Sequence, residues 1–375
     1  MYAQMARCKD LDVTVLYCSD QGVKNRADRQ FRADVAWDIP ILEGYRSVFL
    51  KNYAPRPSVY GFWGLQNWGV VAYLLKAPKS VLVVNGWNYP VCLAAILAGR
   101  VFGHTVCLRG ESPLTRELKK SKRSIRFRRF LLGNMLFRFI HYFLYIGSRN
   151  KAFYEFYGVP GPKLIFTPYS VDNERFIRLF PKDEAAKKAL RRSLNLPESG
   201  PVVLYSGKYM PKKRPLDLLG AFARLDRPDC HLVMVGEGEL RPQMEAFIES
   251  RRLANVRLTG FVNQTDIPRY YAAADIFVMC SDADETWGLS VNEAMNLGLP
   301  VIVSDETGCA ADLVRQGENG FVFPAGDVDA LAGCLGMLAR NDGLRASAGD
   351  ASRQIIAEYS YQKIIDHLKT IPCPR

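Results

Sequence analysis

Two glutamates in the second half of the sequence have a spacing that suits the binding of a hydroxylated ligand. Glu285 and Glu293 lie within SDADETWGLSVNEAMNLGLPVIVSD (281–305) with seven residues between them, one of which is Gly288. The run VNEAMNLG (291–298) has a helical pattern, so Glu293 should lie in a helix and Glu285 on the loop before it. Carboxylates accept hydrogen bonds from hydroxyl groups, and the N–H groups at a helix start bind phosphate. Together these features fit a sugar nucleotide, although a helix cap beside one solvated glutamate would explain the same spacing.

A basic loop supplies a second candidate phosphate site. GKYMPKKRP (207–215) follows the strand-like run PVVLYSG (201–207) and contains four cations: Lys208, Lys212, Lys213 and Arg214. Ligands of doubly wound sheets bind at the carboxyl ends of strands, and cations placed there neutralise a diphosphate. A solvated basic turn remains the alternative for one or two of the four.

The elements that would position these residues alternate between strand and helix. In the second half we expect strands at 201–207, 231–236, 256–260, 275–280, 300–304 and 319–323, with helices at 214–225, 238–253, 266–274, 291–298, 309–314 and 327–340. In the first half we expect strands at 11–18, 80–86, 105–111, 143–148 and 163–169, and a helix at 90–103. Such alternation predicts an α/β protein with two Rossmann-like, doubly wound parallel-sheet domains.

Domain boundaries follow from where the periodic pattern stops. We expect an N-terminal domain at 1–170, a C-terminal domain at 171–357 and a final helix at 358–375, with the junction near 169–178. The chain opens with the helix-like MYAQMARC directly before LDVTVLYC. The first strand of the N-terminal domain is therefore expected to be missing, or to lie upstream of Met1.

Composition and charge restrict the class of protein. The 375 residues are 48% hydrophobic and 23% charged, as in an ordinary globular protein. No run of about 18 uncharged apolar residues occurs, so no membrane-spanning helix is expected, and the first residues lack a signal-peptide pattern. None of the nine cysteines forms a CxxC pair, which favours reduced, buried side chains in the cytosol over disulfides or zinc ligands.

At this point the second half resembles the nucleotide-binding domain of retaining glycosyltransferases of the GT-B fold, known as group 1 and similar to family 4. The residues that carry the resemblance are SGKYMPKKRPLDLLGAF, HLVMVGEGELR, VRLTGFV, YYAAADIFVMCSDADETWGLSVNEAMNLGLPVIVSDETG and GENGFVFPAGD. The resemblance implies two domains that face each other across a cleft and a last helix that crosses back to the first domain. It also implies that the chain is an enzyme.

The resemblance assigns roles to individual residues. It implies that Glu285 contacts the donor sugar, that Glu293 binds the ribose hydroxyls and that Lys208 and Lys213 hold the diphosphate. Position 208 is usually arginine in the family, so Lys208 is a departure that keeps the charge and loses the bidentate fork. The remaining donor-site residues are expected to be Gly207, Gly236, Trp287, Gly288 and Leu289.

The chemistry implied is transfer of the sugar to a hydroxyl on the front face, with the leaving phosphate accepting the proton. The donor is then a substrate, and neither a cofactor nor a metal is expected. Asp282 and Asp284 form an Asp-x-Asp triplet that binds metal in a different glycosyltransferase fold. We interpret this triplet as solvated loop.

The first half resembles the acceptor domain of the same family more weakly. NGWNYP (85–90) and LRGES (108–112) both follow strands, which makes Asn85, Trp87 and Glu111 candidate acceptor contacts. Arg109 stands where many relatives carry histidine and is a candidate catalytic residue that contacts an acceptor anion or the donor phosphate. A structural ion pair between neighbouring loops is the alternative for Arg109 and Glu111.

The first half is also strongly basic. Residues 1–170 hold 25 Lys and Arg against 10 Asp and Glu, a net charge of +15, whereas residues 171–375 carry −3. Eight of the cations fall within 116–129, in one helical stretch followed by apolar and aromatic residues. This pattern favours contact of 115–140 with an anionic membrane surface, and a surface helix packed on its own domain is the alternative.

These observations predict a cytoplasmic enzyme, peripheral on the inner face of the membrane, that glycosylates a lipid-linked or polysaccharide acceptor. The family resemblance points to bacterial envelope or exopolysaccharide synthesis. Two other readings stay open: a sugar-nucleotide-binding protein without turnover, and a nucleic-acid-binding protein. Nucleic-acid binding would interleave cations with exposed aromatics on one surface. Here the cations cluster in one helical stretch beside an apolar run, so we expect no nucleic-acid partner.

Overall fold

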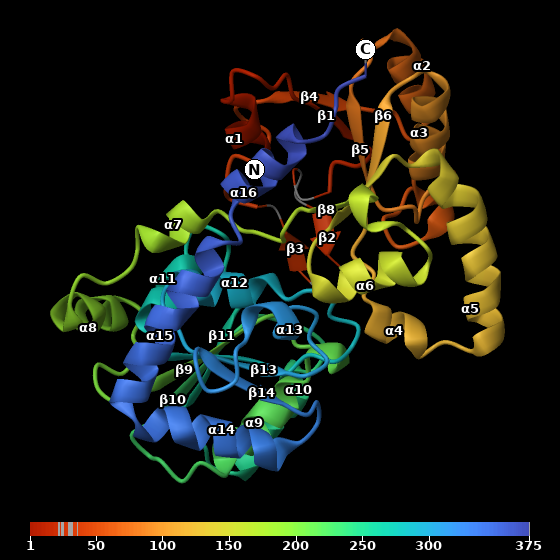
Figure 1. Cartoon of the computed structure of the whole chain (residues 1–375). Helices are drawn as coiled ribbons and strands as arrows, with labels where there is room; N and C mark the ends of the chain where they lie inside the picture. Colours follow the sequence, from red (N-terminus) through yellow and green to blue (C-terminus); the bar gives the residue numbers. More distant parts are fainter. Residues whose placement is uncertain (22, 24–25, 29–32, 36, 375) are drawn as a thin grey trace. The chain divides into compact units, whose positions relative to one another are not determined.

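A computed structural model describes residues 1–21, 23, 26–28, 33–35 and 37–374. The chain divides into two compact units. Unit 1 comprises Met1–Lys24, Pro40–Tyr169 and Tyr361–Arg375, and unit 2 comprises Asn25–Ile39 and Ser170–Ser360. Each unit contains its own parallel sheet (Figure 1), as the alternating pattern predicts.

Unit 2 is built on a six-stranded parallel sheet in the order β11-β10-β9-β12-β13-β14. The strands are β9 (Val202–Ser206), β10 (His231–Val235), β11 (Val256–Gly260), β12 (Ile276–Met279), β13 (Val301–Ser304) and β14 (Gly320–Phe323). This is the doubly wound order, in which the chain starts at the centre, moves to one edge and returns to build the other half. Each strand lies within an apolar run of the sequence, because both faces of a parallel sheet are covered.

The helices of unit 2 cover both faces of that sheet. They are α7 (Asn173–Ile177), α8 (Glu184–Ser193), η5 (Pro211–Lys213), α9 (Pro215–Ala223), α10 (Arg241–Ser250), α11 (Ile267–Ala273), α12 (Leu289–Asn296), α13 (Ala310–Leu313), α14 (Val328–Arg340) and α15 (Asp342–Ala357). Figure 1 shows α9, α10 and α14 along one face and α11 and α12 toward the other. Side-chain caps begin α14 and α15, where Asp327 accepts from the Ala330 N–H and Asn341 from the Leu344 N–H, both at 2.9 Å.

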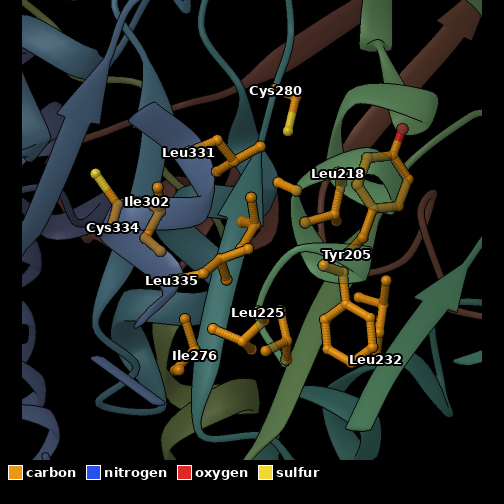
Figure 2. Close-up of a cluster of buried hydrophobic side chains, with 14 of the residues drawn as sticks. Tyr205, Leu218, Leu225, Leu232, Ile276, Cys280, Ile302, Leu331, Cys334 and Leu335 are labelled. Atoms are coloured by element: carbon orange, nitrogen blue, oxygen red, sulfur yellow. The ribbon is translucent and has the colours of Figure 1, made fainter. Parts of the chain in front are cut away.

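The core of unit 2 lies between the sheet and the α9, α10 and α14 layer. Figure 2 shows side chains from strands and helices meeting there, including Leu232, Ile276 and Ile302 from the sheet and Leu218 and Leu335 from helices. These side chains are fully buried, so the sheet is held rigidly from one side. A short antiparallel pair, β2 (Arg26–Asp28) and β3 (Ala33–Val35), clusters with this unit.

Unit 1 contains a four-stranded parallel sheet in the order β5-β6-β7-β8, plus the parallel pair β1-β4. Its strands are β1 (Thr14–Tyr17), β4 (Arg46–Phe49), β5 (Val81–Asn85), β6 (Thr105–Arg109), β7 (Tyr142–Tyr145) and β8 (Leu164–Phe166). Its helices are α1 (Tyr2–Ala6), η1 (Phe62–Gly64), α2 (Gly69–Lys76), α3 (Pro90–Val101), α4 (Leu114–Leu118), α5 (Lys122–Arg128), η2 (Arg129–Met135), η3 (Leu136–Phe139), α6 (Ser148–Phe156), η4 (Gly161–Lys163) and α16 (Tyr361–Lys369). The C-terminal α16 packs on β8, where the His367 ring nitrogen lies 2.5 Å from the Phe166 carbonyl.

The basic stretch is not the single helix that we expected. It divides into α4, α5, a π-helical segment η2 and the 3-10 turn η3. The division between α4 and α5 has a local cause, because the Ser121 hydroxyl accepts from the Ser124 N–H at 3.3 Å and starts a new helix. The cations are therefore distributed over several short elements.

Candidate functional site

The predicted donor residues gather around the topological switch point of the unit 2 sheet. Strand β9 pairs with β10 on one side and with β12 on the other, so the chain leaves β9 and β12 in opposite directions. A crevice at the carboxyl ends of such a strand pair is where doubly wound sheets bind ligands. The loop after β9 contains Gly207, Lys208 and Lys213, and the loop after β12 contains Glu285 and Gly288.

Lys213 and Glu285 form a direct ion pair between the loops that follow β9 and β12. The Lys213 ammonium donates to the Glu285 carboxylate, and both side chains are largely buried, with 16% and 14% of their surface exposed. A main-chain hydrogen bond of 2.8 Å from the Asp282 N–H to the Lys212 carbonyl ties the two loops together beside the pair. The structure therefore brings together the residue expected to hold diphosphate and the residue expected to contact the sugar.

Lys208 comes two residues after β9 and is partly buried. Its carbonyl accepts hydrogen bonds from the Tyr205 hydroxyl and the Met210 N–H, at 3.1 and 3.0 Å, which hold the backbone of this turn in place. Lys208 thus shares with Lys213 the loop that follows β9.

Glu293 lies on α12, partly buried below the same loop. Its carboxylate accepts a hydrogen bond of 2.6 Å from the fully buried Tyr271 of α11. Burial raises the pKa of Glu293 to about 7, against the hydrogen bond from Tyr271 and the positive charge of Arg175. At neutral pH Glu293 is therefore close to its ionisation midpoint, and its ionised form can accept hydrogen bonds from a ligand.

Glycines near these side chains allow neighbouring segments of the chain to approach closely. Gly288 is the N-cap of α12 with φ of +102°, and a Cβ there would lie 2.7 Å from the Met279 sulfur. At Gly236 a Cβ would lie 1.9 Å from the Gly207 carbonyl oxygen, so the loops after β9 and β10 touch through their backbones. Leu289 is the first helical residue and is 36% exposed. The α12 N-terminus therefore lies next to the loop that contains Glu285, and its first N–H groups make no hydrogen bond to a carbonyl four residues earlier.

Trp287 has a different environment from the other predicted donor residues. It is 2% exposed, its ring lies 5.9 Å from that of Tyr359, and its indole N–H donates to the Asn292 side chain at 2.8 Å. The backbone of its loop is braced by the segment after β13, where the Gly308 N–H donates to the Glu285 carbonyl and the Cys309 N–H to the Trp287 carbonyl, at 3.0 and 2.9 Å. Trp287 thus anchors the loop that presents Glu285.

In unit 1 the predicted residues follow β5 and β6. Arg109 ends β6, and its guanidinium lies over the Tyr169 ring at 5.0 Å, while its buried Nε has no hydrogen-bond partner. The Tyr169 hydroxyl donates to the exposed Glu111 carboxylate. Arg109 and Glu111 are therefore linked through Tyr169.

Asn85 and Trp87 lie on the neighbouring loop. Asn85 is exposed at the end of β5 and hydrogen-bonds the Tyr2 hydroxyl. Trp87 stacks on Phe153 with ring centroids 6.0 Å apart and planes 13° apart, so one face of its ring belongs to the core of unit 1. The four acceptor-side residues thus occupy the carboxyl edge of the β5-β6 pair.

Among the described residues, no group of three or more His, Cys, Asp and Glu side chains is arranged to hold a metal ion. In the triplet, the Asp282 carboxylate accepts from the Asp284 N–H at 2.9 Å, as in a local loop turn. No helix within the described part of the chain combines the length and the apolar character that crossing a bilayer requires.

Comparison with known proteins places this site in a family. Residues 186–355 match the family model described as Glycosyl transferases group 1. The segment that holds the candidate donor residues is thus similar to the group 1 glycosyltransferases. One relative is the GDP-mannose-dependent monoacylated alpha-(1-6)-phosphatidylinositol monomannoside mannosyltransferase of Corynebacterium glutamicum, 31% identical over 224 residues, which are 56% of this chain and 56% of the relative. The matched segments span roughly half of the curated relatives' own lengths, between 36% and 56% in three of them.

Solved structures extend the fold assignment to both units. Sucrose-phosphate synthase from Thermosynechococcus elongatus aligns with a TM-score of 0.71 over 98% of this chain and 90% of its own, at 19% identity. Alr3699/HepE of Anabaena, solved in complex with UDP and glucose, aligns with a TM-score of 0.67 over 88% and 87%, at 20% identity. The chain therefore has the GT-B fold, with two Rossmann-like parallel-sheet domains, as predicted.

The candidate site includes residues that the sequence motifs did not single out. Tyr271 binds Glu293, Arg175 contributes charge near it, and Gly308 supports the Glu285 backbone. A Cβ at Gly308 would lie 2.0 Å from the Thr286 carbonyl oxygen, so this position admits only glycine. The Thr-Gly pair at 307–308 after β13 was the one local signal for that contact.

Proposed function

We propose that this chain is a retaining glycosyltransferase that moves a sugar from a nucleoside diphosphate donor to a hydroxyl of a lipid-linked or polysaccharide acceptor. The observation that carries the proposal is the Lys213–Glu285 pair at the β9–β12 switch point, with Glu293 on the adjoining helix. Lys213 would then bind phosphate, Glu285 the sugar and Glu293 the ribose, all at the carboxyl edge of one sheet. Of the known ligand classes, a sugar nucleotide uses all three.

The ion pair suggests how the donor enters. A diphosphate carries more charge than one carboxylate and competes for the Lys213 ammonium. Once Lys213 turns to phosphate, the Glu285 carboxylate is released to accept hydrogen bonds from the sugar hydroxyls. Glu293 accepts from the ribose hydroxyls in its ionised form.

Charge stabilisation drives the transfer step in this proposal. The bond from the anomeric carbon to the diphosphate oxygen breaks while the acceptor oxygen attacks the same face, and the acceptor proton passes to the leaving phosphate. Lys208, Lys213 and the N–H groups at the start of α12 stabilise the negative charge that develops on the diphosphate. Arg109 would contact acceptor or donor phosphate, and Asn85, Trp87 and Glu111 would contact the acceptor.

Relatives support the donor and acceptor classes. HepE is described as a complex with UDP and glucose, and the Corynebacterium relative is named for GDP-mannose and a phosphatidylinositol monomannoside. Several other relatives carry names from lipopolysaccharide and lipid-linked sugar synthesis, which favours envelope or exopolysaccharide synthesis as the setting of this chain.

The surface of 114–139 favours a cytoplasmic enzyme held at the inner face of the membrane. Six apolar side chains are at least 37% exposed in this segment: Leu118, Phe127, Phe130, Leu131, Met135 and Phe139. Exposed cations, including Arg123 and Arg126, lie in the same segment. Apolar groups that enter the headgroup region beside cations that attract anionic lipids are typical of interfacial helices.

A thermal-shift panel of UDP-, GDP- and ADP-sugars tests donor binding. One nucleotide class should raise the melting temperature of the wild type, and Glu293→Ala should lose that shift because the ribose contact is gone. Asp284→Asn, on the loop before α12 and outside the proposed contacts, is the matched control and should keep the shift. Absence of a shift with every sugar nucleotide would refute the donor assignment.

Proton NMR of the sugar released during slow donor hydrolysis tests turnover and stereochemistry. An α-linked donor should release the α-anomer first, before mutarotation. Release of the β-anomer would contradict retention. Donor binding without any release or transfer would instead identify a sugar-nucleotide-binding protein.

A further inference from the structure

A closed network of contacts joins the loop that presents Glu285 to two of the places where the chain passes between its units. These two connections lie between Tyr169 and Ser170 and between Ser360 and Tyr361. The members of this Trp287 network all belong to unit 2 and are Ser170, Asn173, Trp287, Asn292, Asn296 and Tyr359. The network is therefore contained within one compact unit.

The network begins with two aromatic side chains in contact. The Trp287 ring lies 5.9 Å from the Tyr359 ring, and the two planes are 36° apart. Trp287 stands two residues after Glu285 and is only 2% exposed. Tyr359 lies in the turn between α15 and α16, one residue before the end of unit 2 at the second connection. Tyr359 therefore packs against the side chain that anchors the Glu285 loop.

Three hydrogen bonds lead from Trp287 to α7. The Trp287 indole N–H donates to the Asn292 side chain at 2.8 Å, and the Asn296 side chain donates to the Asn292 carbonyl at the same distance. The Asn296 amide also donates to the Asn173 side chain at 3.2 Å. Asn292 and Asn296 are four positions apart, so they share one face of α12 and link the Glu285 loop to Asn173.

Two further hydrogen bonds close the network at the connections. The Asn173 amide donates to the Tyr359 carbonyl at 3.2 Å, and the Ser170 hydroxyl donates to the same carbonyl at 2.8 Å. Ser170 follows the first connection directly, and Tyr359 precedes the second by one residue. The unit 2 ends of the two connections are therefore bonded to each other and, through Tyr359, packed against Trp287.

The burial of these amides points to a role in positioning. Asn292 and Asn296 are 0% and 1% exposed, and the Asn296 side-chain oxygen has no hydrogen-bond partner among the described residues. A buried amide oxygen without a partner lowers the free energy of unfolding, and an apolar side chain of similar size would avoid that cost. The bonds that Asn296 donates fix the geometry of α7 and α12, which stability alone would not require.

We propose that Tyr359 is a positioning residue for the donor sugar, because it holds Trp287 and thereby the Glu285 carboxylate in place, and that the Trp287 network links this loop to the two connections. The link stands on the contacts alone, whereas the sugar as ligand of Glu285 rests on the proposed function. The Gly308 and Cys309 N–H groups hold the loop by its backbone, at the Glu285 and Trp287 carbonyls. Tyr359 supports the side chain of the same loop.

Isothermal titration of Tyr359→Ala tests the positioning role. The ligands are the UDP-, GDP- or ADP-sugar that stabilises the wild type and the corresponding nucleoside diphosphate. Loss of the ring should weaken sugar-nucleotide binding about tenfold, the usual effect of one charged hydrogen bond, and should change diphosphate binding less than about twofold. The sugar alone uses Glu285, so a general structural defect would weaken both ligands equally. Equal weakening, or no weakening of either, would overturn the proposal.

Tyr359→Phe tests whether the ring is the cause. Phenylalanine keeps an aromatic ring beside Trp287 and keeps the main-chain carbonyl, so this variant should retain the wild-type ratio of the two affinities. It also provides a measurement if Tyr359→Ala fails to fold. A loss of sugar-nucleotide binding in Tyr359→Phe as large as about tenfold would show that the ring contact does not position Glu285.

Hydrogen exchange in the ligand-free protein tests the link to the connections. Asn173→Ala removes the bonds to Asn296 and Tyr359 and should speed amide exchange at 285–289 about fivefold, as expected for one neutral hydrogen bond carried through the network. Asn255→Ala is the matched control, because it removes a 2.7 Å bond to the Cys230 carbonyl elsewhere in unit 2. Unchanged exchange at 285–289 in Asn173→Ala, or equal acceleration in Asn255→Ala, would overturn the link.

The two kinds of measurement separate this proposal from the proposed function. If no sugar nucleotide binds the wild type, the proposed function and the positioning of the sugar both fail, and the exchange result still decides the link. If sugar nucleotide binds the wild type and Tyr359→Ala with the same affinity, the proposed function stands and the positioning role fails.

Discussion

Replacement of Glu293 by glutamine should stabilise the C-terminal domain at alkaline pH. The pKa of Glu293 is about 7 in the folded chain against an ordinary 4.5. Because the folded pKa is raised, stability is fully present below about pH 4.5 and is lost as pH rises through 7. Each pKa unit corresponds to about 1.4 kcal/mol, so ionisation costs the folded state up to about 3 kcal/mol at pH 8.5. Glutamine stays neutral and still accepts from Tyr271, so Glu293→Gln escapes that loss.

Hydrogen exchange of peptides from α12 as a function of urea measures this effect. It reports the unfolding free energy of one domain, whereas a single transition for a two-domain chain is not two-state. At pH 5 the variant and the wild type should differ by less than about 1 kcal/mol, and at pH 8.5 the variant should be more stable by up to about 3 kcal/mol. The exposed Glu239→Gln is the control and should change stability by at most about 0.5 kcal/mol at either pH.

The refuting result is a variant-minus-wild-type difference that does not change between pH 5 and pH 8.5. That outcome would mean that Glu293 ionises normally and is solvated. Tyr271→Phe provides a second check, because removing the hydrogen bond that lowers the Glu293 pKa should move the transition to higher pH. Movement to lower pH would contradict the assigned cause.

Three other predictions follow from the same geometry. Lys213→Met leaves the Glu285 carboxylate without its partner and should lower transfer at least about 100-fold in a donor-turnover assay; activity within tenfold of wild type would remove Lys213 from the mechanism. Gly288→Ala forces a side chain into a left-handed conformation and a close contact, so it should cost more than about 1 kcal/mol in the α12 exchange experiment, and unchanged protection would contradict the contact. Arg123→Gln with Arg126→Gln should weaken binding to anionic vesicles about 30-fold, from about 1 kcal/mol per cation, and leave neutral vesicles unaffected; equal binding in a sedimentation assay would exclude this surface.

The strands and the donor loops were predictable because their signals are local. Buried parallel strands appear as uninterrupted apolar runs, as at 276–279 and 301–304, and each of these lies within its predicted range. β4 was not predicted, because its four residues RSVF form a short strand of a two-stranded sheet in which none is buried: the outer two are exposed and the inner two partly buried. We expected one helix here and missed the break between α4 and α5. Ser121, whose side chain caps α5, was the local signal for it.

The contacts within the site depend on distances that the sequence does not contain. Lys213 and Glu285 were assigned to the same sheet edge, but their pairing depends on a turn in which Arg214 adopts φ of +48°. The hydrogen bond between Tyr271 and Glu293 joins residues that are 22 positions apart on two helices, and no local sequence pattern predicts it. Trp287 was expected to contact the donor. It is instead buried against Tyr359, which lies in the turn between α15 and α16, and no local pattern predicts a contact between residues so far apart in the sequence.

The buried carboxylate of Glu117 has a consequence for how this chain tolerates mutation. It is the one acid among eight cations in 116–129, and it orients Lys120, Arg128 and Tyr157. Exposed cations such as Arg123 can be replaced with little effect on folding, so substitutions there can change the attraction to an anionic membrane surface. Glu117 has no such freedom, because without it the buried face would hold uncompensated positive charge. Glu117 is therefore expected to tolerate substitution less well than the exposed cations of the same stretch.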